Sequence, residues 1–173
     1  MDSQQTLHGL GYLFGAMIVL CSATILFTEV KMNNTYLFVY GTLRSATNSE
    51  MFQLLARHAD FVGAASYQGK LYKIDDYPGV IPSKNKADLV QGEVYQLHDA
   101  DFILPQLDDY EECGPSYLQP TEYVRELCEV RLQNNQIIQA WFYRYNRATD
   151  TLKLIASGDF VAGNTGKAIT LDT

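Results

Sequence analysis

The sequence has few cysteines and few basic residues, and each shortage excludes a class of function. Its three cysteines, Cys21, Cys113 and Cys128, lie far apart and form no CxxC pair. This spacing indicates neither a zinc site nor a disulfide framework, and it is typical of a cytoplasmic domain with reduced thiols. The chain has 13 basic and 20 acidic residues, a net charge of −7 and no basic cluster, so we do not expect a nucleic-acid partner.

Several common catalytic motifs are also missing. No glycine-rich strand–turn–helix fingerprint is present, which disfavours a doubly wound dinucleotide-binding fold. There is no G-x-S-x-G nucleophile elbow. His8, His58 and His98 have no Cys, Ser or carboxylate pattern around them that indicates a triad or a metal site. The sequence therefore predicts no metal centre.

What the chain does have is enough apolar sequence for one domain, preceded by a different segment. Of its 173 residues 47% are hydrophobic, and we divide them into a hydrophobic segment (1–31), a globular domain (32–161) and a flexible tail (162–173). Residues 9–27 carry no formal charge, and a bilayer span needs about 20 apolar residues. No basic residue precedes them and no cleavage site follows, which argues against a signal peptide. A single-pass membrane anchor and a translation start at Met32 both stay open.

The hydrophobic pattern of the globular part predicts strands interspersed with two helices. We expect strands at 36–40, twice within 61–74, and at 89–97, 121–132 and 137–145, with helices at 48–58 and 99–112. The expected irregularities are a type II turn at Tyr77-Pro78-Gly79, a bulge at Gly92, a kink or two abutting turns at Pro105, and a hairpin at Asn134-Asn135. This order predicts an α+β fold with a small mixed, barrel-like sheet and two or more helices.

Two stretches could carry chemistry. In YLFVYGTLR, at 36–44, Gly41 has no Cβ, so the backbone N–H groups after the strand could hold an anion or a carbonyl. In LDDYEEC, at 107–113, carboxylates three and four residues apart share a helix face, which raises the pKa of the least solvated one and suits a general base. The alternatives are an ordinary strand-to-loop glycine and a solvated acidic helix end.

Together these motifs resemble a known family. YGTLR, YPG, GEVY, LDDYE followed by Tyr117, and LIASGDF occur in one order between about residues 36 and 160. This combination resembles the γ-glutamylcyclotransferase-like superfamily, and is most similar to the γ-glutamylaminecyclotransferase branch and its small bacterial relatives. The resemblance implies that Glu111 is the general acid/base, with Glu112 ranked second. It also implies a substrate pocket lined by Tyr40, Gly41, Thr42, Leu43, Tyr72 and Tyr117.

The activity that the resemblance implies is cyclisation of a γ-glutamyl group to 5-oxoproline, with release of an amine or an amino acid. The partner would be a small γ-glutamyl substrate, and neither a metal nor an organic cofactor would be required. A second reading is a non-catalytic binding or regulatory module that keeps the γ-glutamyl pocket. Contact with a membrane would involve residues 9–27 only.

Overall fold

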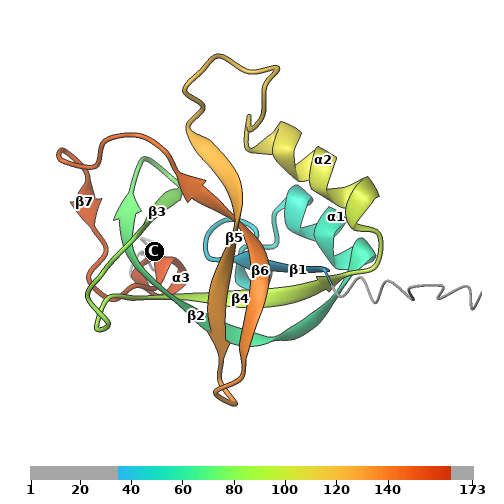
Figure 1. The fold of residues 1–173 in the computed structure, drawn as a ribbon, viewed down its shortest axis with the longest axis horizontal. Coiled ribbons are helices and arrows are strands. Elements are labelled where there is room, and N and C mark those ends of the chain that lie inside the picture. The colour runs from blue at the N-terminus through green and yellow to red at the C-terminus, as the bar shows by residue number, and fades with distance from the viewer. Residues whose placement is uncertain (1–34, 165–173) are drawn as a thin grey trace, which may run out of the picture. The chain divides into compact units, whose positions relative to one another are not determined.

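The computed structural model describes residues 35–164, and these residues form an α+β fold (Figure 1). The elements are β1 (Thr35–Val39), η1 (Ser45–Thr47), α1 (Glu50–His58), β2 (Ala59–Lys73), β3 (Pro78–Pro82), β4 (Leu89–Leu97), α2 (Ala100–Tyr110), β5 (Tyr123–Leu132), β6 (Ile137–Tyr145), β7 (Lys153–Leu154) and α3 (Phe160–Asn164). The predicted N-terminal segment, with its residues 9–27, lies outside the described residues. Between residues 35 and 164, no helix has the length and hydrophobicity needed to cross a membrane.

The strands form a barrel, as the sequence predicted. Their order is β3-β2-β4-β1-β6-β5, and an additional β2–β5 pairing closes β2, β4, β1, β6 and β5 on themselves. The central strand β1 pairs with β4 in the antiparallel sense and with β6 in the parallel sense, with Leu37 opposite both Tyr95 and Trp141. The sheet is therefore mixed. β1 has a hydrogen-bonded neighbour on each side, and the β2–β5 pairing gives the outer barrel strands the same.

Both faces of β1 are buried, which explains its uninterrupted apolar sequence. Phe38 and the following Tyr40 belong to a cluster drawn from all the barrel strands. Leu37 and Val39 belong to a second cluster, which includes Leu55 of α1 and residues of α2. The side-chain alternation of one strand thus joins the barrel interior to the helical layer, and the chain leaves β1 between these two cores.

The predicted pair of short strands in 61–74 is wrong, because β2 is one strand of 15 residues. The pairing of β2 with β4 shifts in register between Phe61 and Gly63, and such a shift lets a strand bend without ending. The first part of β2 pairs with β4 and β5, and residues 69–73 pair with β3. A single bent strand therefore serves both the barrel and a small hairpin beside it.

Each of the two long helices begins after a residue whose side chain caps its first turn. Ser49 Oγ accepts a hydrogen bond from Phe52 N at 3.1 Å, and Asp99 Oδ1 accepts one from Phe102 N at 3.1 Å. α2 is a single helix that contains Pro105, so the expectation of two abutting turns there is wrong. Pro105 lies on the exposed side of α2, where water can reach the carbonyl that its missing N–H leaves unpaired.

Two predictions about glycines were wrong. Gly79 lies within β3 without a positive φ, so there is no type II turn at 77–79; a Cβ there would lie 2.7 Å from Tyr145 Cγ, and the glycine serves packing. Gly92 pairs with Ala65 without a register shift, so it is not a bulge. The predicted tail begins inside α3, and its residues after 164 lie outside the described part. The hairpin is confirmed, with Asn135 at a φ of 67°.

Candidate functional site

A cavity of about 460 Å³ lies where β1 ends and the helical layer begins. Its lining comes from residues 38–43 at the end of β1, 76–78 before and at the start of β3, 110–112 at the end of α2, 122–123 at the start of β5, and Tyr143 of β6. A volume of this size suits a small metabolite. The two stretches singled out in the sequence, YGTLR and LDDYEEC, therefore meet at one cavity, although 60 or more residues separate them in the chain.

The four carboxylates of the LDDYEEC stretch have different surroundings. Asp108 Oδ1 accepts a hydrogen bond from the Tyr143 hydroxyl at 2.8 Å and an ion pair from Arg125 Nε at 3.0 Å. Asp109 accepts a hydrogen bond from the Tyr117 hydroxyl. Only Glu111 and Glu112 line the cavity. The first two carboxylates thus attach the end of α2 to its neighbours, and chemistry is left to the other two.

A C-terminal turn of α2 places Glu111 and Glu112 differently. Glu112 N donates to Asp109 O at 3.2 Å and Cys113 N donates to Asp108 O at 2.7 Å, which is the Schellman pattern with Glu111 as the C-cap. Glu112 takes the left-handed position, with a φ of 48°, where glycine is usual. Glu112 is exposed, whereas Glu111 is partly buried.

The surroundings of Glu111 favour its neutral form. Burial, and to a lesser extent the nearby Glu122 carboxylate, together raise the pKa of the Glu111 carboxyl from 4.5 to about 7. The Glu111 carboxyl forms no hydrogen bond or ion pair with another residue in the range 35–164. A carboxyl that is half ionised near neutral pH can both accept and donate a proton.

Three tyrosines that line the cavity use their hydroxyl groups in structural hydrogen bonds. Tyr40 donates to Tyr143 O at 2.6 Å, Tyr123 donates to Pro78 O at 2.8 Å, and Tyr143 donates to Asp108. Burial is the main cause that raises the pKa of each of these phenols above its usual value of 10. These groups stay neutral near pH 7, so they give the cavity a rigid and mostly apolar wall rather than a base.

The turn after β1 presents backbone rather than side-chain donors. Gly41 packs against Pro78, since a Cβ at Gly41 would lie 2.7 Å from Pro78 Cγ. No turn or side-chain hydrogen bond between described residues takes up the N–H groups of Gly41, Thr42 and Leu43. The described lining includes no Lys, Arg or His. An anionic group in this cavity would therefore be bound by backbone amides, as in other anion-binding turns.

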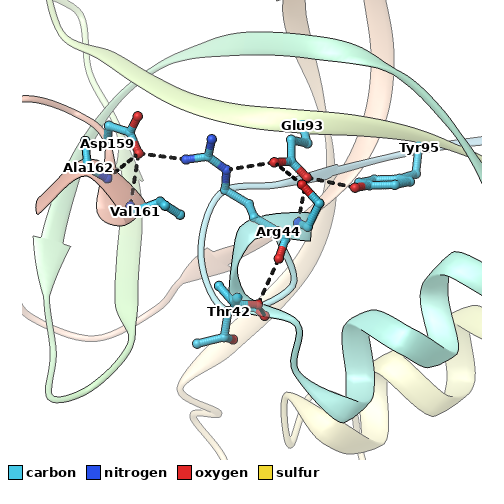
Figure 2. Close-up of polar contacts among 9 residues, drawn as sticks. Thr42, Arg44, Glu93, Tyr95, Asp159, Val161 and Ala162 are labelled. Carbon is cyan, nitrogen blue, oxygen red and sulfur yellow. Dashed lines mark hydrogen bonds and ion pairs between the residues drawn. The ribbon is translucent and has the colours of Figure 1, made fainter. Parts of the chain in front are cut away.

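A polar network attaches Arg44 and Ser45, which directly follow this turn, to β4 and to the segment before α3 (Figure 2). Glu93 of the GEVY motif, only 7% exposed, accepts hydrogen bonds from Ser45 N at 2.8 Å and from the Tyr95 hydroxyl at 2.7 Å. Arg44 lies between Glu93 and Asp159, with Nε 3.4 Å from Glu93 Oε1 and Nη1 2.7 Å from Asp159 Oδ1. The GEVY and LIASGDF stretches thus reach the YGTLR turn in space.

Not every predicted site residue lines the cavity. Tyr40, Gly41, Thr42, Leu43 and Glu111 do, together with the second-ranked Glu112. Tyr72 lies in the part of β2 that pairs with β3 and β7, and Tyr117 lies in the loop after α2, bonded to Asp109; neither is part of the lining. Their roles as pocket residues stay predictions that the geometry does not favour.

The sequence reasoning also missed residues that the fold brings to the cavity. Glu122 precedes β5, and its carboxylate accepts a hydrogen bond from the Tyr77 hydroxyl at 3.3 Å and lies 3.8 Å from Arg147 Nη1. Asp76 and Tyr123 line the cavity as well. No local motif marks these residues, because they reach the site from separate connections. The buried Glu93 did carry a signal, because it is the one charged residue of strand β4.

Fold and site together define a class: a small closed α+β barrel whose cavity is lined both by the raised-pKa carboxyl of Glu111 and by the turn at residues 41–43. The chain belongs to the γ-glutamyl cyclotransferase, AIG2-like family, whose model matches residues 37–162. The resemblance predicted from the motifs is confirmed, and so is the predicted fold class.

Individual relatives agree with this assignment. The chain is 34% identical over 125 residues to the γ-glutamylcyclotransferase family protein YtfP of Escherichia coli K12, covering 72% of this chain and 95% of that protein. Among solved structures, YkqA of Bacillus subtilis superposes with a TM-score of 0.55 at 26% identity, over 73% of this chain but only 39% of that longer chain. An AIG2-like protein of Mus musculus shares the fold, with a TM-score of 0.53 at 23% identity, over 69% of this chain and 84% of that chain.

Proposed function

We propose that this protein is a cyclotransferase that converts a γ-glutamyl group to 5-oxoproline and releases an amine or an amino acid. The observation that carries the proposal is the position of Glu111. Its carboxyl has a pKa raised to about 7 and lines the same cavity as the backbone amides of Gly41, Thr42 and Leu43. Membership of the family supports the reaction class.

The reaction needs one base and one oxyanion site. The α-amine of the γ-glutamyl group attacks its own γ-carbonyl carbon, so that a new C–N bond closes a five-membered ring and the bond to the leaving nitrogen breaks. Glu111 removes a proton from the α-ammonium and later gives it to the leaving nitrogen. The second proton, which the attacking nitrogen loses as the ring closes, is taken up by the released amine, which leaves as an ammonium ion, so no net proton is consumed by the residue. Such proton transfers contribute roughly 10²–10⁴-fold in rate.

The cavity walls suit the charges of this substrate. Its α-ammonium would lie near a lining that includes Asp76, Glu111, Glu112 and Glu122 and no described basic side chain. Its carboxylate, and the oxyanion that forms at the γ-carbonyl, would be left to the amides at 41–43. Each well-placed oxyanion donor is worth about 3–4 kcal/mol of barrier. Because the attack is intramolecular, holding the substrate in a folded shape supplies much of the remaining acceleration.

A direct screen tests the proposal. The full chain is offered γ-glutamyl-ε-lysine, γ-glutamyl amino acids and glutathione, and released 5-oxoproline is measured beside the variant Glu111→Gln. We expect release by the wild type only, and the preferred compound identifies the leaving group. A folded wild-type protein that releases nothing from any of the three would contradict the proposal. Binding of 5-oxoproline without turnover would instead indicate the non-catalytic module.

A further inference from the structure

Outside the cavity, Glu93 has a buried carboxylate with several hydrogen-bond partners. A carboxylate that is 7% exposed is costly to bury unless it is fully hydrogen-bonded. Glu93 meets that requirement with Ser45 N at 2.8 Å, Ser45 Oγ at 3.0 Å, the Tyr95 hydroxyl at 2.7 Å and Arg44 Nε at 3.4 Å. Three of these four donors belong to residues 44 and 45, directly after the cavity-lining turn.

The turn between Tyr40 and Arg44 is held through its carbonyl groups, and no turn or side-chain hydrogen bond within residues 35–164 uses the N–H groups of residues 41–43. Arg44 N donates to Gly41 O at 3.1 Å. The carbonyl of Thr42 accepts from Thr47 Oγ1 at 2.5 Å and from Ser49 Oγ, the N-cap of α1, at 2.9 Å. Glu93 fixes the residues that come next. The backbone of 41–43 is therefore held from both ends, and none of these bonds uses the N–H groups that face a ligand in the proposed reaction.

A second carboxylate holds Arg44 from the opposite side (Figure 2). Asp159 Oδ1 lies 2.7 Å from Arg44 Nη1, and the same oxygen accepts from Val161 N at 3.0 Å. Gly158, at a φ of 66°, carries the carbonyl that accepts from Gln91 N at 2.8 Å, and a Cβ there would lie 1.9 Å from Leu89 O. The segment before α3 is thus seated on β4, and this seating sets the position of Asp159.

We propose that Glu93 and Asp159 are positioning residues, which hold Arg44 and Ser45 so that the backbone amides of residues 41–43 keep a fixed place on the cavity wall. Neither carboxylate is part of the cavity lining, so their effect on substrate is exerted through the turn. The kinetic part of this inference depends on the proposed cyclotransferase reaction. The structural part does not.

Three variants of the full chain separate positioning from stability. Glu93→Gln and Asp159→Asn remove the charges that hold Arg44. The control is Glu126→Gln, which breaks a more exposed ion pair between β5 and β6, Arg144 Nε to Glu126 Oε1 at 2.9 Å, whose residues do not line the cavity. Each protein is measured for its melting temperature, for kcat and KM on the preferred γ-glutamyl compound, and for the ¹H–¹⁵N resonances of Gly41, Thr42 and Leu43.

We expect Glu93→Gln to lower kcat by about 10–100-fold, because a misplaced oxyanion donor acts in the transition state. KM should rise by a smaller factor, because the same amides hold the carboxylate of the bound substrate. Asp159→Asn should act in the same direction but more weakly, and both should shift the resonances of 41–43. Asp159→Asn keeps the test valid if Glu93→Gln does not fold. Glu126→Gln should change neither kcat nor these resonances.

The outcomes that overturn the inference are equally specific. Folded Glu93→Gln and Asp159→Asn proteins with the resonances of 41–43 unchanged would show that the turn keeps its place without them. The same conclusion would follow if kcat fell no further than in Glu126→Gln. A wild type without turnover would contradict the proposed reaction instead, and the resonances alone would then decide whether the two carboxylates position the turn.

Discussion

At the scale of single residues, Glu111 links function to stability. Its pKa is 4.5 in an unfolded chain and about 7 in the folded one. Between these values the folded protein holds a proton that the unfolded protein releases. The ionised Glu111 carboxylate therefore destabilises the fold fully above pH 7, and this destabilisation disappears below pH 4.5. A functional carboxyl of this kind is a local conflict with stability, as is common at catalytic sites.

The variant Glu111→Gln should therefore be more stable than the wild type at high pH. We expect its free energy of unfolding to exceed that of the wild type by up to about 3 kcal/mol at pH 8, and to match it within about 0.5 kcal/mol at pH 4. Urea denaturation at the two pH values measures this difference. A gain that is the same at both values would show that ionisation of Glu111 is not its cause.

The same group should govern the acid limb of the pH–rate profile. We expect kcat/KM to fall as the pH drops through about 7, because Glu111 must be ionised to act as the base. Glu122→Gln removes the second cause of the raised pKa, so its limb should move to lower pH by at most about one unit. A limb that moves to higher pH in Glu122→Gln would contradict this assignment.

At the scale of elements, the end of α2 determines how the two neighbouring glutamates are used. The turn at 111–113 leaves Glu111 partly buried as the C-cap and puts the exposed Glu112 in the left-handed conformation. For a residue with a Cβ this conformation costs about 1–2 kcal/mol. The element therefore carries strain at the position next to the proposed base.

Glu112→Gly should relieve that strain. We expect a gain of about 0.5–1 kcal/mol in the free energy of unfolding, since glycine adopts a positive φ freely but loses more backbone entropy on folding. Glu112→Ala is the matched control, because it removes the same carboxylate but keeps a Cβ. Equal stabilisation by both variants would assign the effect to charge rather than to backbone conformation.

At the scale of the whole molecule, the barrel depends on close backbone approach at Gly92. A Cβ there would lie 2.4 Å from Val39 O and 2.5 Å from Phe38 Cε2. We expect Gly92→Ala to cost about 1–3 kcal/mol through overpacking of the barrel interior. Gly63→Ala is the control, because its nearest neighbour, Leu132 Cδ2, is 4.0 Å away. Equal stability of the two variants would show that the barrel has room at Gly92.

The sequence predicted the elements better than their irregularities. The hydrophobic pattern placed β4 and β6 to the residue and both long helices to within two residues at each end. Gly79 and Gly92 were misjudged, because glycine is needed there by a Tyr145 ring and by the Val39 carbonyl, partners that lie far away in the chain. The same limit applies to the site. Glu111 can be named through the LDDYE motif that carries the family resemblance, whereas Glu122 and the partners of Glu93 come from distant parts of the chain that only the fold brings together.

The most direct test of the account compares two adjacent carboxylates. Glu111→Gln and Glu112→Gln remove the same charge one residue apart; both residues line the cavity, but Glu111 is partly buried and Glu112 is exposed. On the preferred γ-glutamyl compound, we predict that kcat for 5-oxoproline release falls roughly 10²–10⁴-fold in Glu111→Gln and less than about 10-fold in Glu112→Gln. Full activity in a folded Glu111→Gln protein would contradict the central claim.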